Sequence, residues 1–249
     1  MLFEDGHLLA LDKPSGLLSS PDRYDRARPN LMRLLHAGIA RGLPWARRRQ
    51  LSYLANAHRL DCETSGIILL AKDKLVLAAL AEQFSAGRPT KHYLALVHGA
   101  PREDAFEVHA KLAPHPARPQ MMRVDQKAGK NARTRFTVAE RYAGYALLRC
   151  QPLTGRTHQI RAHLRHCGLP VVGDVLYGGK PLLLSSLKPG YRFKRDEPER
   201  PLMGRVALHA ESLTLRHPAT QAPVTITAPW PRDLAVAVKY LRRYAPFGR

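Results

Sequence analysis

The chain contains the segment His58-Arg59-Leu60-Asp61-Cys62-Glu63-Thr64-Ser65-Gly66, which runs directly into Ile67-Ile68-Leu69-Leu70-Ala71-Lys72. The apolar run ends in a charge, which is the pattern of a strand buried on both faces. The polar half ends in Thr-Ser-Gly, residues typical of a turn. We therefore expect Asp61 at the mouth of a rigid strand, where its carboxylate can either cap a loop or take part in chemistry.

A second motif lies further along the chain and reads Thr154-Gly155-Arg156-Thr157-His158-Gln159-Ile160-Arg161. It predicts the start of a helix, with Thr154 or Thr157 as N-cap and Ile160 and Leu164 as an i, i+4 apolar pair on the inner face. His163 and Cys167 have the same spacing, which would allow two zinc ligands on one helical face. No comparable pair of Cys or His exists elsewhere in the sequence, and the arginines between these residues would repel a cation. We therefore expect no metal site.

Both motifs resemble those of the RluA-type RNA pseudouridine synthases. The first is similar to the family's catalytic motif, His-Arg-Leu-Asp-x-x-Thr-Ser-Gly, and the second to its Gly-Arg-x-His-Gln-Ile-Arg motif. Lys91-His92-Tyr93-Leu94-Ala95 resembles the family's Lys-x-Tyr-x-Ala block, and residues 170–178 resemble its continuation. The resemblance covers nearly the whole chain. The family's opening block begins almost at residue 1, so we expect no N-terminal RNA-binding domain of the S4 type.

The resemblance implies three catalytic residues. Asp61 is the essential nucleophile of the family, Tyr93 lies in the active site, and Arg161 pairs with the aspartate in relatives. A nearby arginine favours the ionised form of a carboxylate and orients it through its planar fork. The implied reaction breaks the N1–C1′ bond of uridine, turns the uracil and rejoins it through C5. Because nothing is oxidised and no group is added, we expect no cofactor.

The charge of the chain predicts a polyanionic partner. Forty Lys and Arg against twenty Asp and Glu give a formal net charge of +20, which favours RNA over a membrane surface. We expect RNA contacts from basic groups around the site, His58, Arg59, Arg156 and His158, and from a cluster formed by Arg47, Arg48 and Arg49. The resemblance assigns Arg59 to holding a flipped-out uridine. Three basic regions, 41–49, 118–135 and 180–205, are expected to be loops.

The sequence also suggests where the protein acts. Its N-terminus is acidic and lacks a signal-peptide layout, and no apolar run approaches the roughly 20 residues that span a bilayer. Three cysteines without paired spacing suit a reducing compartment. We expect a cytoplasmic monomer that acts on tRNA or rRNA.

The remaining pattern predicts an α+β protein. Strands are expected at 7–14, 91–99, 106–112, 133–141, 145–150, 207–216 and 224–227, and helices at 30–42, 74–86 and 232–244. Residues 113–132 are expected to form an RNA-facing loop, and 179–204 a loop insertion in a single catalytic domain, 1–249. The resemblance implies the pseudouridine synthase fold, a long mixed and mainly antiparallel sheet with flanking helices and loops around a central cleft.

Two other classes of function stay open at this point. A non-catalytic RNA-binding or ribosome-assembly protein would explain the charge without a reactive Asp61. A glycosidase or nucleoside hydrolase would use Asp61 and Glu63, although a small nucleoside does not call for so much positive charge. Mass-neutral conversion of uridine without release of free uracil would separate all three.

Overall fold

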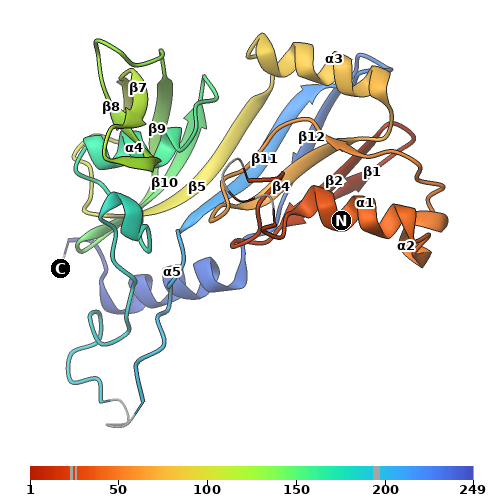
Figure 1. Cartoon of the computed structure of the whole chain (residues 1–249). Coiled ribbons are helices and arrows are strands. Elements are labelled where there is room, and N and C mark those ends of the chain that lie inside the picture. Colours follow the sequence, from red (N-terminus) through yellow and green to blue (C-terminus); the bar gives the residue numbers. More distant parts are fainter. Residues whose placement is uncertain (23–24, 26, 193–196, 249) are drawn as a thin grey trace. The chain divides into compact units, whose positions relative to one another are not determined.

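The computed structural model describes residues 1–22, 25, 27–192 and 197–248 (Figure 1). The chain forms two compact units, Met1–Lys91 with Ala210–Pro229 and His92–His209 with Trp230–Arg249. It passes between them inside two strands, β5 (Thr90–His98) and β11 (Leu208–Arg216), and a third time between Pro229 and Trp230. The single domain expected for 1–249 stays a prediction.

The first unit is a small sheet with three helices. Its strands follow the order β1-β2-β4-β11, with β3 beside β4 and β12 beside β11. The pairs β1–β2, β2–β4, β3–β4 and β11–β12 are antiparallel. Besides β11, its elements are β1 (Phe3–Glu4), β2 (Leu8–Lys13), α1 (Leu31–Ala40), α2 (Pro44–Arg47), β3 (Ala55–Asn56), β4 (Ser65–Ala71), α3 (Lys74–Ser85) and β12 (Pro223–Thr227).

Strand β4 is buried along its whole length, as the apolar run predicts. Ile67 and Leu69 belong to a buried cluster that includes residues of α3. Ile68 and Leu70 point the other way, into a cluster with residues of α1. Because alternate side chains of a strand face opposite sides, a helix on each side makes every position apolar. The strand is therefore fixed from both faces.

The helix starts of the first unit follow the sequence rules. The side chain of Asn30 accepts a hydrogen bond from the Arg33 N–H at 2.9 Å, and that of Asp73 accepts one from the Val76 N–H at 2.8 Å. Each satisfies a backbone donor that the first turn of a helix leaves without a partner. The predicted helices at 30–42 and after Asp73 are thus confirmed.

The second unit is a four-stranded sheet with a separate hairpin, and its strands follow the order β5-β10-β9-β6. All three pairings in this order are antiparallel. Helices α4 and α5 supply Leu164 and Leu234 to the core that they share with β5 and β10. Besides β5, its elements are β6 (Ala105–His109), β7 (Leu112–His115), β8 (Arg118–Val124), β9 (Arg133–Tyr142), β10 (Tyr145–Pro152), α4 (Gln159–His166), the 3-10 helix η1 (Val175–Tyr177) and α5 (Arg232–Tyr244).

Residues 113–132, predicted as a loop, instead contain most of the antiparallel hairpin β7–β8. Pro114 and Pro119 weaken the strand pattern in the sequence. A two-stranded sheet tolerates them because each strand pairs with only one other strand, so that a missing N–H on its other side costs little. Strong strand residues were therefore not needed for pairing here.

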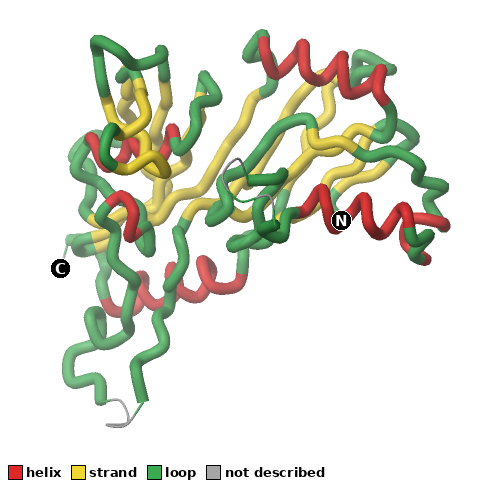
Figure 2. Tube along the Cα trace, viewed as in Figure 1, coloured by secondary structure: helices red, strands yellow, loops and turns green. Residues whose placement is uncertain are grey.

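The described part of 179–204 is mainly loop and turn, with an isolated bridge between Leu182 and Met203 (Figure 2). Both bridge residues and Leu187 are buried in the core of the second unit. Residues 193–196 lie outside the described part, and the insertion stays a prediction.

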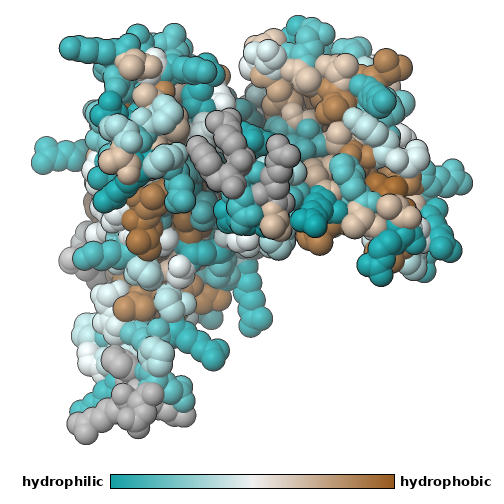
Figure 3. Space-filling view, in the orientation of Figure 1, coloured by the Kyte–Doolittle hydropathy of each residue, from teal (hydrophilic) through white to brown (hydrophobic). Residues whose placement is uncertain are grey.

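The visible face of the molecule is mostly hydrophilic, with hydrophobic residues in small groups (Figure 3). No helix in the described ranges combines the length and apolar character that crossing a bilayer requires.

Candidate active site

Asp61 lies in the loop between β3 and β4, as expected. Its side chain is half-buried, and its carbonyl oxygen accepts a hydrogen bond from the Thr64 N–H at 3.2 Å, which closes a turn. Thr64 and Ser65 are buried, whereas Arg59 is exposed on the same loop. The turn therefore places the carboxylate directly before the rigid strand β4.

A buried lysine holds this loop. Lys13, at the end of β2, is only 1% exposed. Its Nζ donates hydrogen bonds to the carbonyl oxygens of Pro14 at 2.8 Å, Leu17 at 2.7 Å and Cys62 at 3.2 Å. An ammonium group supplies three donors, so one side chain can fasten two loop segments at once. The residue following Asp61 is thereby tied to the end of β2.

Two serines extend the same support. The Ser15 hydroxyl donates to the carbonyl oxygen of Glu63 at 2.5 Å, and the Ser19 hydroxyl donates to that of Leu60 at 2.9 Å. Ser19 also accepts from the Leu60 N–H at 3.0 Å, and the Gly16 N–H donates to the Cys62 carbonyl at 2.8 Å. The loop is therefore held through its main chain on both sides of Asp61.

Gly66 shows why the motif ends in glycine. Its φ is +110°, a conformation that residues with a Cβ rarely adopt. A Cβ at this position would also collide with the backbone of Ala210 in the neighbouring strand. The close approach of β11 to β4 therefore requires glycine here.

His58 is bound into the first unit. Its Nε2 accepts a hydrogen bond from the Leu69 N–H at 3.1 Å, and its ring stacks on Phe84 with centroids 5.1 Å apart. Burial, with a smaller contribution from the nearby charge of Lys91, lowers the pKa of His58 to about 4. The ring is therefore neutral at pH 7 and ties the loop to β4, and its predicted contact with RNA stays a prediction.

Cys62 stands next to Asp61 without the environment of a reactive thiol. Burial and the adjacent carboxylate of Glu63 raise the pKa of its thiol above the ordinary value. A thiolate, not a thiol, is the nucleophilic form. The carboxylate of Asp61 is therefore the better candidate in this loop.

Tyr93 lies in the part of β5 that belongs to the second unit, where it pairs in register with Cys150 of β10. Its side chain is half-buried and packs against the main core of this unit. One side of the ring is thus fixed by packing, while part of it stays accessible. A role beside the uracil stays a prediction.

The second motif begins its helix differently from the prediction. Helix α4 starts after His158, which is the N-cap with a φ of 51° and makes no side-chain capping bond. Thr154, expected as a cap, instead donates from its hydroxyl to Gln159 Oε1 at 2.7 Å. The same oxygen accepts from the Arg156 N–H at 3.0 Å. Gln159 therefore organises the turn, and neither Thr154 nor Thr157 is the N-cap.

Ile160 and Leu164 are both buried in the core, which confirms the predicted apolar pair. On another side of α4, the two ring nitrogens of His163 contact the Thr134 hydroxyl at 2.9 Å and the Ala110 carbonyl at 3.0 Å. Both nitrogens therefore have polar partners, which argues against a zinc ligand. Within the described ranges, no group of three or more His, Cys, Asp or Glu residues could hold a metal ion.

Arg161 is a buried cation bound to a carboxylate that the sequence analysis did not single out. Its Nε lies 2.6 Å from Asp174 Oδ2 and its Nη2 lies 2.9 Å from Asp174 Oδ1. The two residues are 1% and 0% exposed. The Arg161 guanidinium also lies 5.0 Å from the ring centroid of Tyr177. Pairing with Asp61 was the expectation; pairing with Asp174 is what the structure shows, and a second pairing with Asp61 stays a prediction.

Tyr177 connects this ion pair to its surroundings. Its hydroxyl accepts a hydrogen bond from the Met122 N–H at 2.8 Å and lies 3.0 Å from His158 Nδ1. The ring is almost fully buried. The sequence signal for Asp174 and Tyr177 is that both stand in the family-like segment 170–178, which does not say that either of them meets Arg161.

The basic residues expected to bind RNA differ in their exposure and in their contacts within the protein. Arg156 is exposed, and its Nε donates to the Asn131 carbonyl at 3.0 Å. Arg47 and Arg48 are exposed, but Arg49 is half-buried and forms an ion pair with Glu4 at 2.9 Å. The region 41–49, expected to be a loop, contains the short helix α2, because Pro44 starts a turn at its first position. RNA contacts by these residues stay predictions.

Each unit therefore brings together part of the predicted set. Asp61, His58 and Arg59 share one loop of the first unit, with Arg47, Arg48 and Arg49 elsewhere in that unit. Tyr93, Arg156, His158 and Arg161 belong to the second unit. Lys13, Ser15, Ser19, Gln159, Asp174 and Tyr177 were missed as parts of the site, since their roles are to hold other residues.

Comparison with known proteins shows which family the chain resembles. A family model described as RNA pseudouridylate synthase matches residues 7–166. Ribosomal large subunit pseudouridine synthase C of Escherichia coli is 36% identical over 245 residues, which cover 97% of this chain and 70% of that protein. Ribosomal large subunit pseudouridine synthase D of Xylella fastidiosa is 37% identical over 250 residues, covering 97% and 69%.

Solved structures show the same fold. Human RNA Pseudouridylate Synthase Domain Containing 4 matches with a TM-score of 0.71 and 23% identity, over 97% of this chain and 92% of that one. Human RNA Pseudouridylate Synthase Domain Containing 1 matches with a TM-score of 0.64 and 24% identity, over 92% and 82%. These likenesses show the fold, and the family model together with the relatives above identifies the activity. The chain belongs to the RNA pseudouridylate synthases, isomerases that convert uridine in RNA to pseudouridine.

Proposed function

We propose that this enzyme isomerises uridine in the RNA of the large ribosomal subunit, with Asp61 as its nucleophile. The relatives named above are ribosomal large subunit pseudouridine synthases, and they match nearly the whole chain. That similarity favours ribosomal RNA over tRNA as the substrate.

The observation that carries the role of Asp61 is the way in which its loop is held. Lys13, Ser15 and Ser19 bind the main chain around the aspartate, so the loop is held in a defined position. Catalysis requires a reacting group held in a defined geometry. An ionised carboxylate at such a place can act on the nucleotide while the N1–C1′ bond breaks and the C5–C1′ bond forms.

Arg161 and Tyr93 complete the proposed catalytic set. A guanidinium has five N–H donors, so the edge bound to Asp174 does not by itself prevent Arg161 from contacting a second carboxylate. In the proposal that carboxylate is Asp61, which Arg161 keeps ionised. Tyr93 lies beside the uracil, where its ring stacks on the base and its hydroxyl relays a proton.

The target uridine must leave its stack to reach Asp61. Extrusion costs a few kcal/mol and is cheapest in loops and irregular RNA. In the proposal, the exposed Arg59 and Arg156 offset this cost through contacts with phosphates, and Arg59 holds the uridine in its flipped-out conformation.

The test is to map pseudouridines in ribosomal and transfer RNA from cells with and without this gene. The proposal expects one or a few sites in large-subunit RNA to disappear and to return when the wild-type gene is restored, but not with Asp61→Asn. Loss confined to tRNA would contradict the substrate. An unchanged map would contradict the reaction in these cells, and free uracil released in vitro would instead indicate a hydrolase.

We propose that the enzyme acts in the cytoplasm, as a monomer without a cofactor. Mass photometry of the purified protein at working concentration measures the oligomeric state. Turnover by protein dialysed against a chelator measures the need for a metal.

A further inference from the structure

The second unit carries a groove next to Arg161 that the proposed reaction does not use. It has a volume of about 290 Å³ and lies between strand β8 and helix α4. Its apolar surface comes from Met121, Met122, Val124 and Ala162. Met121 and Ala162 are buried and Met122 and Val124 are half-buried, so the groove exposes the edge of a small buried cluster.

The rim of the groove is basic. Arg123, Arg165 and His166 are exposed, and His115 is half-buried. The lining includes no carboxylate, although Asp125 lies next to it and pairs with Arg123 at 2.8 Å. An apolar surface edged by cations suits a planar ring that carries an anionic group, because bases stack on apolar side chains while arginine binds phosphate.

The groove is directly coupled to Arg161. Ala162 follows Arg161 in α4, and the Met122 N–H donates to the hydroxyl of Tyr177, whose ring lies under the Arg161 guanidinium. If Arg161 acts on the target uridine, an RNA chain that reaches it has neighbouring nucleotides within reach of the groove. A volume of about 290 Å³ is at the small end of ligand sites, which fits one base and not a folded RNA element.

We propose that this groove binds one unpaired base of the substrate RNA, a nucleotide close to the target uridine, with its phosphate at Arg165. The inference rests on the proposed function, since it takes RNA as the substrate. The base stacks on the thioethers of Met121 and Met122, which are polarisable and make favourable contacts with aromatic rings. The groove would thereby select RNA in which a base beside the target is unpaired.

The methionines allow a direct test. The chain has five, and Met32 and Met203 are buried in other clusters. In protein labelled with carbon-13 at the methionine methyl groups, a short single-stranded RNA oligomer is expected to shift the signals of Met121 and Met122 but not those of Met32 and Met203. Single Met→Leu variants assign the signals. An abasic oligomer of the same length is expected to leave the Met121 and Met122 signals in place.

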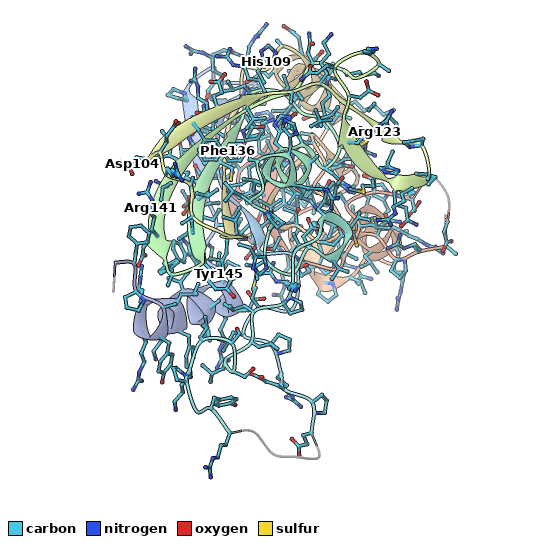
Figure 4. The ribbon with its side chains drawn as sticks, turned by 90° about the vertical axis from the view of Figure 1, so that its left-hand side faces the viewer. Asp104, His109, Arg123, Phe136, Arg141 and Tyr145 are labelled. Atoms are coloured by element: carbon cyan, nitrogen blue, oxygen red, sulfur yellow. The ribbon has the colours of Figure 1, made fainter. Side chains whose placement is uncertain are left out.

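Substitutions in the groove measure its contribution to affinity. Met122→Ala, which keeps the backbone N–H to Tyr177, and Arg165→Ala are each expected to weaken binding of the oligomer by roughly fivefold or more. Arg102→Ala is the matched control. It removes one exposed charge beside the Asp104–Arg141 ion pair, away from Arg123 in Figure 4. The control is expected to change affinity less than twofold.

Two results would overturn the inference. Equal shifts with the RNA and the abasic oligomer would mean that the groove binds only an anion, and unmoved Met121 and Met122 signals in bound protein would mean that no base enters it. Neither result depends on turnover. A failure of the groove is therefore distinguishable from a failure of the proposed reaction, which the map of pseudouridines tests.

Discussion

The loop that carries Asp61 and the helix that carries Arg161 are fixed by different kinds of contact. Around Asp61, the side chains of Lys13, Ser15 and Ser19 donate hydrogen bonds to main-chain oxygens. Arg161 is instead fixed through its own side chain, which shares a buried ion pair with Asp174. A substitution of Asp61 therefore leaves these supports of its loop in place, whereas a substitution of Arg161 removes both the functional group and its anchor.

This difference matters for how catalytic residues are tested. Loss of activity after a change at Asp61 can be read as chemistry if stability is unchanged, because Lys13, Ser15 and Ser19 hold the loop through its main chain. Loss of activity after a change at Arg161 can come from lost chemistry or from lost stability, since removing one partner of a buried ion pair leaves a charge without its counterpart. The next three predictions test this contrast, and a fourth tests where the RNA is bound.

The largest expected effect on stability is that of Asp174→Asn. It leaves the Arg161 guanidinium buried without a carboxylate, and we expect the free energy of unfolding to fall by about 3–5 kcal/mol. Urea unfolding measures it. The matched control is Asp233→Asn, whose bidentate pair with Arg205 is partly exposed and should cost about 1 kcal/mol. Equal losses would show that burial of the Arg161 pair adds nothing.

Arg161→Lys is expected to lower turnover roughly 100-fold, because an ammonium cannot replace the planar, bidentate geometry of the guanidinium. The dissociation constant for RNA should change only a few-fold. Both are measured well below the melting temperature of the variant. Arg232→Lys, at an exposed position of α5, is the control and should change neither. Equal losses in turnover and affinity would instead make Arg161 a contact to phosphate.

Lys13→Met should destabilise the protein by about 2 kcal/mol, since the partly buried carbonyl oxygens of Pro14 and Leu17 lose the donor that this buried side chain supplies. Turnover should fall as well, because the loop loosens around Asp61. Lys74→Met, at an exposed position, is the control, with an expected change within about 0.5 kcal/mol. A stable Lys13→Met variant with full turnover would show that the serines alone hold the loop.

The smallest expected effect concerns the salt dependence of RNA binding. Removing both exposed side chains, Arg47→Ala with Arg48→Ala, should lower the slope of log affinity against log salt by about 1.4–1.8 if each touches a phosphate. Arg49→Ala should change the slope much less, because Arg49 is paired with Glu4. A slope unchanged by the double substitution would place the RNA elsewhere.

Much of the fold was predictable because local rules agree with the tertiary structure. The apolar run at 67–71 became a doubly buried strand, and Asn30 and Asp73 became N-caps. The helix predicted at 232–244 has those bounds. In each case the residues that form the pattern are also the residues that are buried in the element or that cap its end.

The errors arose where the local pattern does not name the partner or the pairing that decides the structure. Thr157 and Thr154 resemble N-caps, but Gln159 binds the Thr154 hydroxyl and the helix starts after His158. The hairpin β7–β8 was not predicted, because its prolines weaken the strand pattern in the sequence although a two-stranded sheet tolerates them. Likewise, a sequence does not state which carboxylate a buried arginine meets, and only the fold brought Asp174 to Arg161.

The central claim is that the carboxylate of Asp61 isomerises uridine. The most direct measurement compares wild-type protein with Asp61→Asn, at enzyme excess, on large-subunit RNA that lacks pseudouridine. The claim predicts site-specific pseudouridine with the wild type and none with the variant, while RNA affinity and the free energy of unfolding stay close to wild type. A variant that forms pseudouridine at a rate within about tenfold of wild type, a barrier difference below about 1.4 kcal/mol, would contradict it.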